Sequence, residues 1–142
     1  MVLSFRVHPR FDGTSQPSHA FDRPEVTGAG ADIASLAAQH PGDSGLFVLD
    51  RGIDALAARV AVVEAAEKSI DAQYYMFHDD VTGGVLLQRM LQAADRGVRV
   101  RLLIDDLGSD GIDGLVAAAN VHPNLEVRMF NPRARGLLGG LT

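Results

Sequence analysis

The 142 residues are 46% hydrophobic and 22% charged, which is the ordinary range of a globular protein and gives room for a single domain. There is no cysteine, which excludes disulfides, thiolate metal sites and a cysteine nucleophile. The 18 acidic residues outnumber the 13 basic ones for a net charge of -5, and Lys68 is the sole lysine, so no broad nucleic-acid-binding patch is expected.

The first part of the chain has no sustained apolar period. Residues 1–30 are rich in Pro, Gly and Ser, so we predict a disordered tail there and an α/β domain over residues 31–142. Apolar residues at helical spacing after Asp32 predict a short helix that is closed near His40. The run GLFVLD, Gly45–Asp50, is apolar and bounded by Gly and Asp, which predicts a strand.

The rest of the chain alternates between helical and strand periodicity. Helices are predicted over Gly52–Ser69, Val85–Ala94 and Ile112–Ala119, and strands over Ile70–Phe77, Val98–Ile104 and Leu125–Phe130. Strands that alternate with crossover helices predict an α/β fold with a mainly parallel or mixed sheet, whose strand order the pattern leaves open. Because Val98–Ile104 ends in a wholly apolar run, we expect its sheet to be covered on both faces.

Two polar groups stand where predicted strands end, and ligands of open α/β sheets gather at such ends. His78 and Asp79 follow one strand, and Asp105 with Asp106 ends another. An imidazole beside carboxylates can act as a general base or contact a phosphate, and clustered carboxylates can hold a divalent cation. An Asp after a strand is also typical of a helix cap or a turn, so spacing leaves both interpretations open. We take His78, Asp79 and Asp105 as candidate substrate contacts.

Several motifs of known nucleotide-binding, hydrolase and metal sites are absent from the sequence. It contains no G-x-x-x-x-G-K-[ST], no G-x-G-x-x-G, no G-x-S-x-G and no pair of His at metal-binding spacing. No apolar run reaches the roughly 20 residues of a membrane-spanning helix, and Met1–Arg10 lacks the apolar core of a signal peptide. We therefore expect a protein that is cytoplasmic or peripheral to the inner membrane.

From Asp54 to Gly111 the sequence resembles the start of a phospholipase D-type domain of the bacterial cardiolipin synthase group, and the similarity extends from about Ile33 to Pro132. The segments that carry it are Ala65-Ala66-Glu67, Gln73-Tyr74-Tyr75, the Asp80–Gly83 turn, Ala93–Val100, His122-Pro123-Asn124 and Phe130-Asn131-Pro132.

The resemblance implies a phospholipase D-like half-domain, one of two similar halves that each supply an H-x-K-x-x-x-x-D motif to a shared active site. One His would form a phosphohistidine and the other would protonate the leaving alcohol. A glycerol hydroxyl or water then accepts the phosphatidyl group. The implied partner is a phospholipid such as phosphatidylglycerol, with no metal or other cofactor and no nucleic acid.

This sequence departs from the family pattern because H-x-K occurs nowhere in it. The chain stops at Thr142, before the first motif is expected, and Arg133–Thr142 leaves the pattern. No catalytic residue is therefore carried over, and we expect the chain to be catalytically incomplete by itself.

Two other classes of function remain open. One is a docking module for an intact relative or an anionic membrane, with self-association through Leu125–Phe130 if that strand is unpaired. The other is a receiver-like domain that binds Mg²⁺ at Asp105 and Asp106.

Overall fold

The computed structural model describes residues 18–109 and 111–132, so the predicted tail over residues 1–17 and the segment 133–142 lie outside the described residues. The elements in chain order are the 3-10 helix η1 (Pro24–Val26), α1 (Gly28–Ala38), α2 (Gly52–Ala65), β1 (Ser69–Met76), α3 (Val81–Asp95), β2 (Arg99–Gly108), α4 (Asp113–Ala119) and β3 (Leu125–Phe130). The described part of the predicted tail, residues 18–30, holds η1 and the first residues of α1. Within the described ranges, no helix has the length and apolar character that a bilayer crossing requires.

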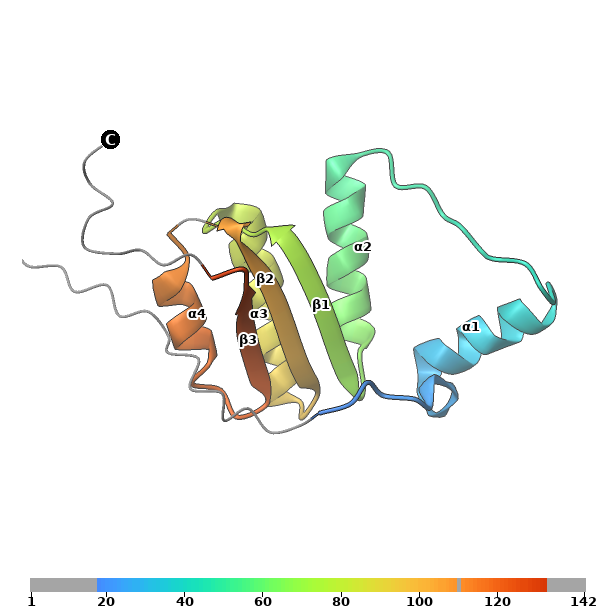
Figure 1. Cartoon of the computed structure of the whole chain (residues 1–142). Coiled ribbons are helices and arrows are strands. Elements are labelled where there is room, and N and C mark those ends of the chain that lie inside the picture. Colours follow the sequence, from blue (N-terminus) through green and yellow to red (C-terminus); the bar gives the residue numbers. More distant parts are fainter. Residues whose placement is uncertain (1–17, 110, 133–142) are drawn as a thin grey trace, which may run out of the picture.

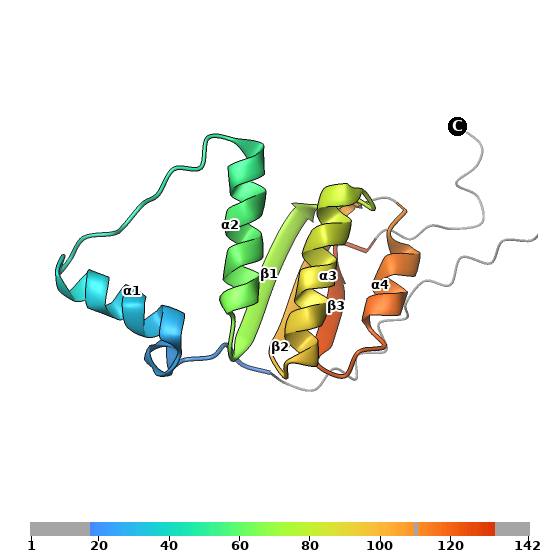
Figure 2. The same cartoon turned by 180° about the vertical axis from the view of Figure 1, so that it is seen from behind.

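The three strands form one parallel sheet in the order β1-β2-β3, which confirms the predicted α/β fold. Ser69 of β1 lies opposite Arg99 of β2, and Val100 of β2 lies opposite Leu125 of β3. The connections through α3 and α4 step across the sheet in the same direction. Since parallel crossovers are almost always right-handed, two such steps put both helices on the same face, as Figures 1 and 2 show.

The core lies between this sheet face and the helices. Every second residue of β2 points into it, and Val100, Leu102 and Ile104 are each no more than 2% exposed. From the helix side, α3 contributes Met90 and Ala93, which are equally buried. The alternation of one residue in and one residue out is the pattern of a sheet that is covered on one face.

The other face of the sheet has no helix on it among the described elements, and Figure 1 looks directly onto it. The expectation of a sheet covered on both faces is therefore wrong for the described residues, because consecutive crossovers of one hand fill one face only. Arg101 on this face pairs with Asp71 on the neighbouring strand. The hydrogen bond from Arg101 lowers the pKa of Asp71 more than its partial burial raises it.

Residues 45–50 form no strand, which corrects the prediction for GLFVLD. The segment has no regular secondary structure, and Leu46 and Phe47 are 94% and 87% exposed. Apolar, β-prone residues become a strand only when a neighbouring strand takes their backbone hydrogen bonds, and no strand of the described residues lies beside them. The predicted short helix is present as α1, but it begins at Gly28, where the Thr27 side chain accepts a hydrogen bond from the Gly30 backbone N–H.

Candidate functional site

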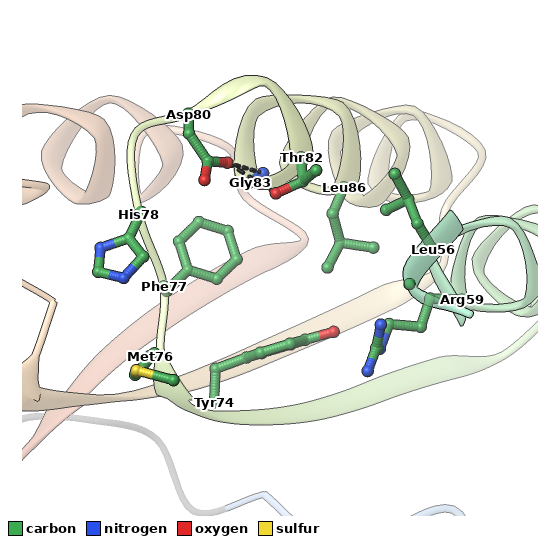
Figure 3. A pocket seen from close by; sticks show the side chains of 11 residues that line it. Leu56, Arg59, Tyr74, Met76, Phe77, His78, Asp80, Thr82, Gly83 and Leu86 are labelled. Atoms are coloured by element: carbon green, nitrogen blue, oxygen red, sulfur yellow. Dashed lines mark hydrogen bonds between the residues drawn. The ribbon is translucent and has the colours of Figure 1, made fainter. Parts of the chain in front are cut away.

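A cleft of about 230 Å³ opens at the carboxyl end of β1, between the start of α2 and the start of α3 (Figure 3). Arg59 reaches into it from α2, Tyr74 from β1 and His78 from the loop that follows β1. Ligands of parallel α/β sheets bind beyond the carboxyl ends of the strands, so this cleft lies where the topology favours a site.

The loop between β1 and α3 is held in place by Phe77. Its backbone N–H donates to the buried Ser109 hydroxyl at 3.1 Å, which ties the end of β1 to the end of β2. Its ring is 4% exposed and meets the Tyr74 ring edge-on, with 5.5 Å between the ring centroids and an interplanar angle of 78°. With Phe77 anchored in this way, the next residue, His78, is placed at the cleft.

Asp80 is the N-cap of α3, which confirms the capping interpretation for this part of the loop. Its Oδ1 accepts hydrogen bonds from the Gly83 backbone N–H at 2.8 Å and from the Thr82 hydroxyl at 2.7 Å. These bonds, the one from Gly83 most of all, hold the pKa of Asp80 below its ordinary value. The carboxylate of Asp80 therefore caps the N-terminus of α3, although Asp80 also lines the cleft.

We expect the stability of the fold to fall in acid partly through Asp80. Because its pKa is lower in the folded than in the unfolded chain, the ionised form stabilises the fold above the unfolded pKa, and this contribution is lost as the pH falls through the folded pKa. Thermal unfolding between pH 7 and pH 3 should show a smaller acid-induced loss of Tm in Asp80→Asn than in the parent. Asp79→Asn, on the exposed neighbour, is the control, and an equal reduction in both variants would contradict the assignment.

Tyr74 and Arg59 both line the cleft, Tyr74 half-buried and Arg59 exposed. Burial raises the pKa of the Tyr74 phenol, and the nearby Arg59 guanidinium opposes that rise without cancelling it. The phenol is therefore a protonated hydrogen-bond donor at neutral pH, and Figure 3 shows it pointing toward Arg59. A guanidinium, a phenol and an imidazole together suit the oxygens of an anionic ligand.

Sequence reasoning did not find Arg59. It lies three residues after Leu56, which also lines the cleft, and four before Val63, the buried residue of α2. Its place on that helical stripe was the available signal, since residues three and four apart share a helix face.

The three residues predicted to contact substrate lie in different places in the structure. His78 lines the cleft, whereas Asp79 is exposed beside it and does not. Asp105 lies on the open face of the sheet, in a hollow of about 180 Å³ that Leu103 and Phe130 also line. A role in substrate binding stays a prediction for each of them.

The carboxylates of Asp105 and Asp106 do not converge. The predicted strand end at these residues is wrong, because β2 runs on to Gly108 and successive side chains of a strand point to opposite faces. Asp105 accepts a hydrogen bond from the Leu107 backbone N–H at 2.8 Å, and Asp106 is buried at 7% exposure. Among residues 18–109 and 111–132, no group of three or more His, Asp or Glu side chains is placed to hold a metal ion.

Comparison with known proteins finds clear relatives. The chain is 47% identical over 106 residues to cardiolipin synthase C of Escherichia coli, and 38% identical over 126 residues to an uncharacterised protein of Helicobacter pylori strain J99. These matches cover 75% and 87% of this chain. Cardiolipin synthases of Pseudomonas entomophila and Bacillus subtilis are 30% and 34% identical over shorter stretches.

The chain spans 22% of the length of the Escherichia coli protein and 25% of the Helicobacter protein. No protein-family profile matches it. The solved structure of TrmBL2, an archaeal chromatin protein, is similar over 74% of this chain and 43% of that chain, but its TM-score of 0.40 and 20% identity are too low to bear on fold or function.

Proposed function

Because this chain is a cardiolipin synthase-like sequence of the phospholipase D superfamily that corresponds to about a fifth of its full-length relatives, we propose that it forms part of the first α/β half of a phosphatidyltransferase. The observation that carries the proposal is the 47% identity over 106 residues to a cardiolipin synthase. The substrate would be a phospholipid such as phosphatidylglycerol, met at the surface of the inner membrane.

The residues that line the cleft support a role for this part of the protein in binding a phospholipid headgroup. Arg59 would offset the charge of a phosphate, and the Tyr74 phenol and the His78 imidazole would hydrogen-bond its oxygens. Asp80 does not compete with the ligand for Arg59, because its carboxylate is bound by the first turn of α3. The residues of this chain would thus position a headgroup.

The covalent step is proposed to need groups from elsewhere in the full-length protein. By analogy with the family, a histidine attacks phosphorus while the leaving glycerol takes a proton from a second histidine. A hydroxyl acceptor then gives its proton to that second histidine and displaces the first histidine from phosphorus. These 142 residues contain no H-x-K, and Lys68 is their sole lysine. The isolated chain is therefore expected to bind a headgroup without turning it over.

The test is a titration of the purified chain with glycerol 3-phosphate, followed by amide NMR. Shifts are expected at Tyr74 and His78, and Arg59→Ala should weaken binding about tenfold, the effect of losing one charged hydrogen bond. Arg51→Ala removes an equal charge from the exposed start of the same helix and should leave the affinity nearly unchanged. Unchanged binding in Arg59→Ala, or an equal loss in both variants, would sink the assignment of the cleft.

A second measurement on the same protein tests whether the chain is catalytically incomplete. Phosphatidylglycerol vesicles and a chromogenic phosphodiester are expected to release no product. Robust turnover that disappears in His78→Ala would overturn the view that the catalytic groups lie outside this chain.

A further inference from the structure

Helix α2 carries Arg59 to the cleft and is buried most deeply near its C-terminal end. Within α2, which the structure describes in full, Val63 is the one buried residue. At the other end of the helix, the N-cap residue Arg51 makes no capping hydrogen bond with its side chain, and Gly52 and Ile53 are exposed. The position of α2 therefore depends mainly on the contacts near Val63.

The C-terminal end of α2 receives a guanidinium from another helix. Arg96, the C-cap of α3, donates from Nη2 to the Glu64 carbonyl at 3.1 Å and to the Val63 carbonyl at 3.3 Å. Both carbonyls belong to the last four of α2, whose usual partners in a following helical turn are missing. The helix dipole also favours a positive charge at this end. Arg96 therefore caps α2 from a different helix.

A second link between the two helices is an ion pair. Arg89 Nε of α3 lies 3.5 Å from Glu64 Oε1, and the two side chains are 38% and 52% exposed, so water screens their attraction. Arg96 makes the stronger link, because it bonds two backbone carbonyls that move only with the helix itself. The packing of α2 against α3 is thus secured at the end of α2.

Both helices run from the carboxyl edge of the sheet to its amino edge (Figure 2). Helix α2 begins at Gly52 beside the cleft and leads into β1, and α3 leads from β1 into β2. Arg96 is therefore at the opposite end from the cleft and does not line it. Arg59 lies four residues before Val63, which is about 6 Å along the helix axis. A tilt or rotation of α2 would therefore move Arg59 relative to the cleft.

We propose that Arg96 is a positioning residue, which fixes the C-terminal end of α2 and thereby holds Arg59 at the cleft. Arg96 touches no ligand and acts only through α2. Its effect on headgroup binding rests on the proposed function of the cleft. Its effect on the position of α2 rests on the hydrogen bonds to Val63 and Glu64 alone.

Titration of the 142-residue chain with glycerol 3-phosphate, followed by amide NMR, tests the effect on binding. Arg96→Ala should weaken binding about threefold, which is part of the roughly tenfold loss expected for Arg59→Ala. Arg96→Lys should keep most of the affinity, because lysine can still donate to one of the carbonyls. In the Arg59→Ala background, Arg96→Ala should cause no further loss, since the residue through which it acts is gone. Arg128→Ala removes an equal charge from β3 and should leave the affinity nearly unchanged.

The position of α2 can be measured without any ligand. The chain has no cysteine, so spin labels can be attached to Arg51→Cys at the start of α2 and to Val121→Cys after α4, where both native side chains are exposed. The distribution of distances between the two labels should be narrow in the parent background and broader with Arg96→Ala. Arg96→Lys and the control Arg128→Ala should both leave it narrow.

Equal label distances with and without Arg96→Ala would overturn the proposal. An additive loss of affinity in the Arg59→Ala background would also overturn it, because Arg96 would then act on binding by another route. If glycerol 3-phosphate does not bind to the parent at all, the proposed function fails, and the label distances alone decide whether Arg96 fixes α2. A broader distribution together with non-additive losses of affinity supports the positioning role.

Discussion

Met90→Ala is expected to lower the free energy of unfolding by about 2–5 kcal/mol, the range for deleting a buried Met, Leu or Ile side chain. Met90 lies in α3 against the covered face of the sheet and is 1% exposed. The substitution removes apolar contacts and leaves a cavity that the close-packed surroundings fill only in part. Since small domains are stable by about 5–15 kcal/mol, a large share of the total would be lost.

Urea denaturation followed by circular dichroism measures this effect as a lower midpoint at constant slope. Met76→Ala is the matched control, because it deletes the same atoms from a side chain that is 61% exposed. The free energies of unfolding of Met90→Ala and Met76→Ala should differ by most of the loss expected for Met90→Ala. Equal losses would contradict the place of Met90 at the centre of the core.

Gly83→Ala is expected to destabilise the fold by about 1–3 kcal/mol, the usual cost of forcing extra volume into a packed site. A Cβ at residue 83 would stand 2.1 Å from the His78 carbonyl oxygen and 3.5 Å from the Phe77 ring. The loop between β1 and α3 would have to move, and the cleft that it borders would change with it. Thermal unfolding of the variant measures the loss.

Gly84→Ala provides a control of opposite sign. A Cβ at this neighbouring position meets no atom within 4 Å. Alanine is favoured over glycine inside a helix by roughly 0.5–1 kcal/mol, so this variant should be more stable than the parent. If both variants shifted the melting temperature in the same direction, close contact at Gly83 would not be the cause.

The sequence by itself determined the type and order of most elements. Leu125–Phe130 was predicted with the bounds that the structure has, and the helix before it differs by one residue, because apolar periods of 2.0 and 3.6 distinguish strand from helix within a short window. Asp80 as a helix cap was also within reach, since its hydrogen bonds go to residues two and three positions on. Each of these features depends on residues that are close together in the sequence.

The tertiary structure decided what depends on residues far apart in the chain. GLFVLD has the composition of a strand, yet a strand exists only where a partner takes its backbone hydrogen bonds. The continuation of β2 past Asp105 placed that carboxylate on the open face, away from the cleft that His78 lines. Arg59 reaches the cleft because α2 packs against α3 at the edge of the sheet, and the periodicity of α2 places Arg59 on a helix face without showing which element that face meets.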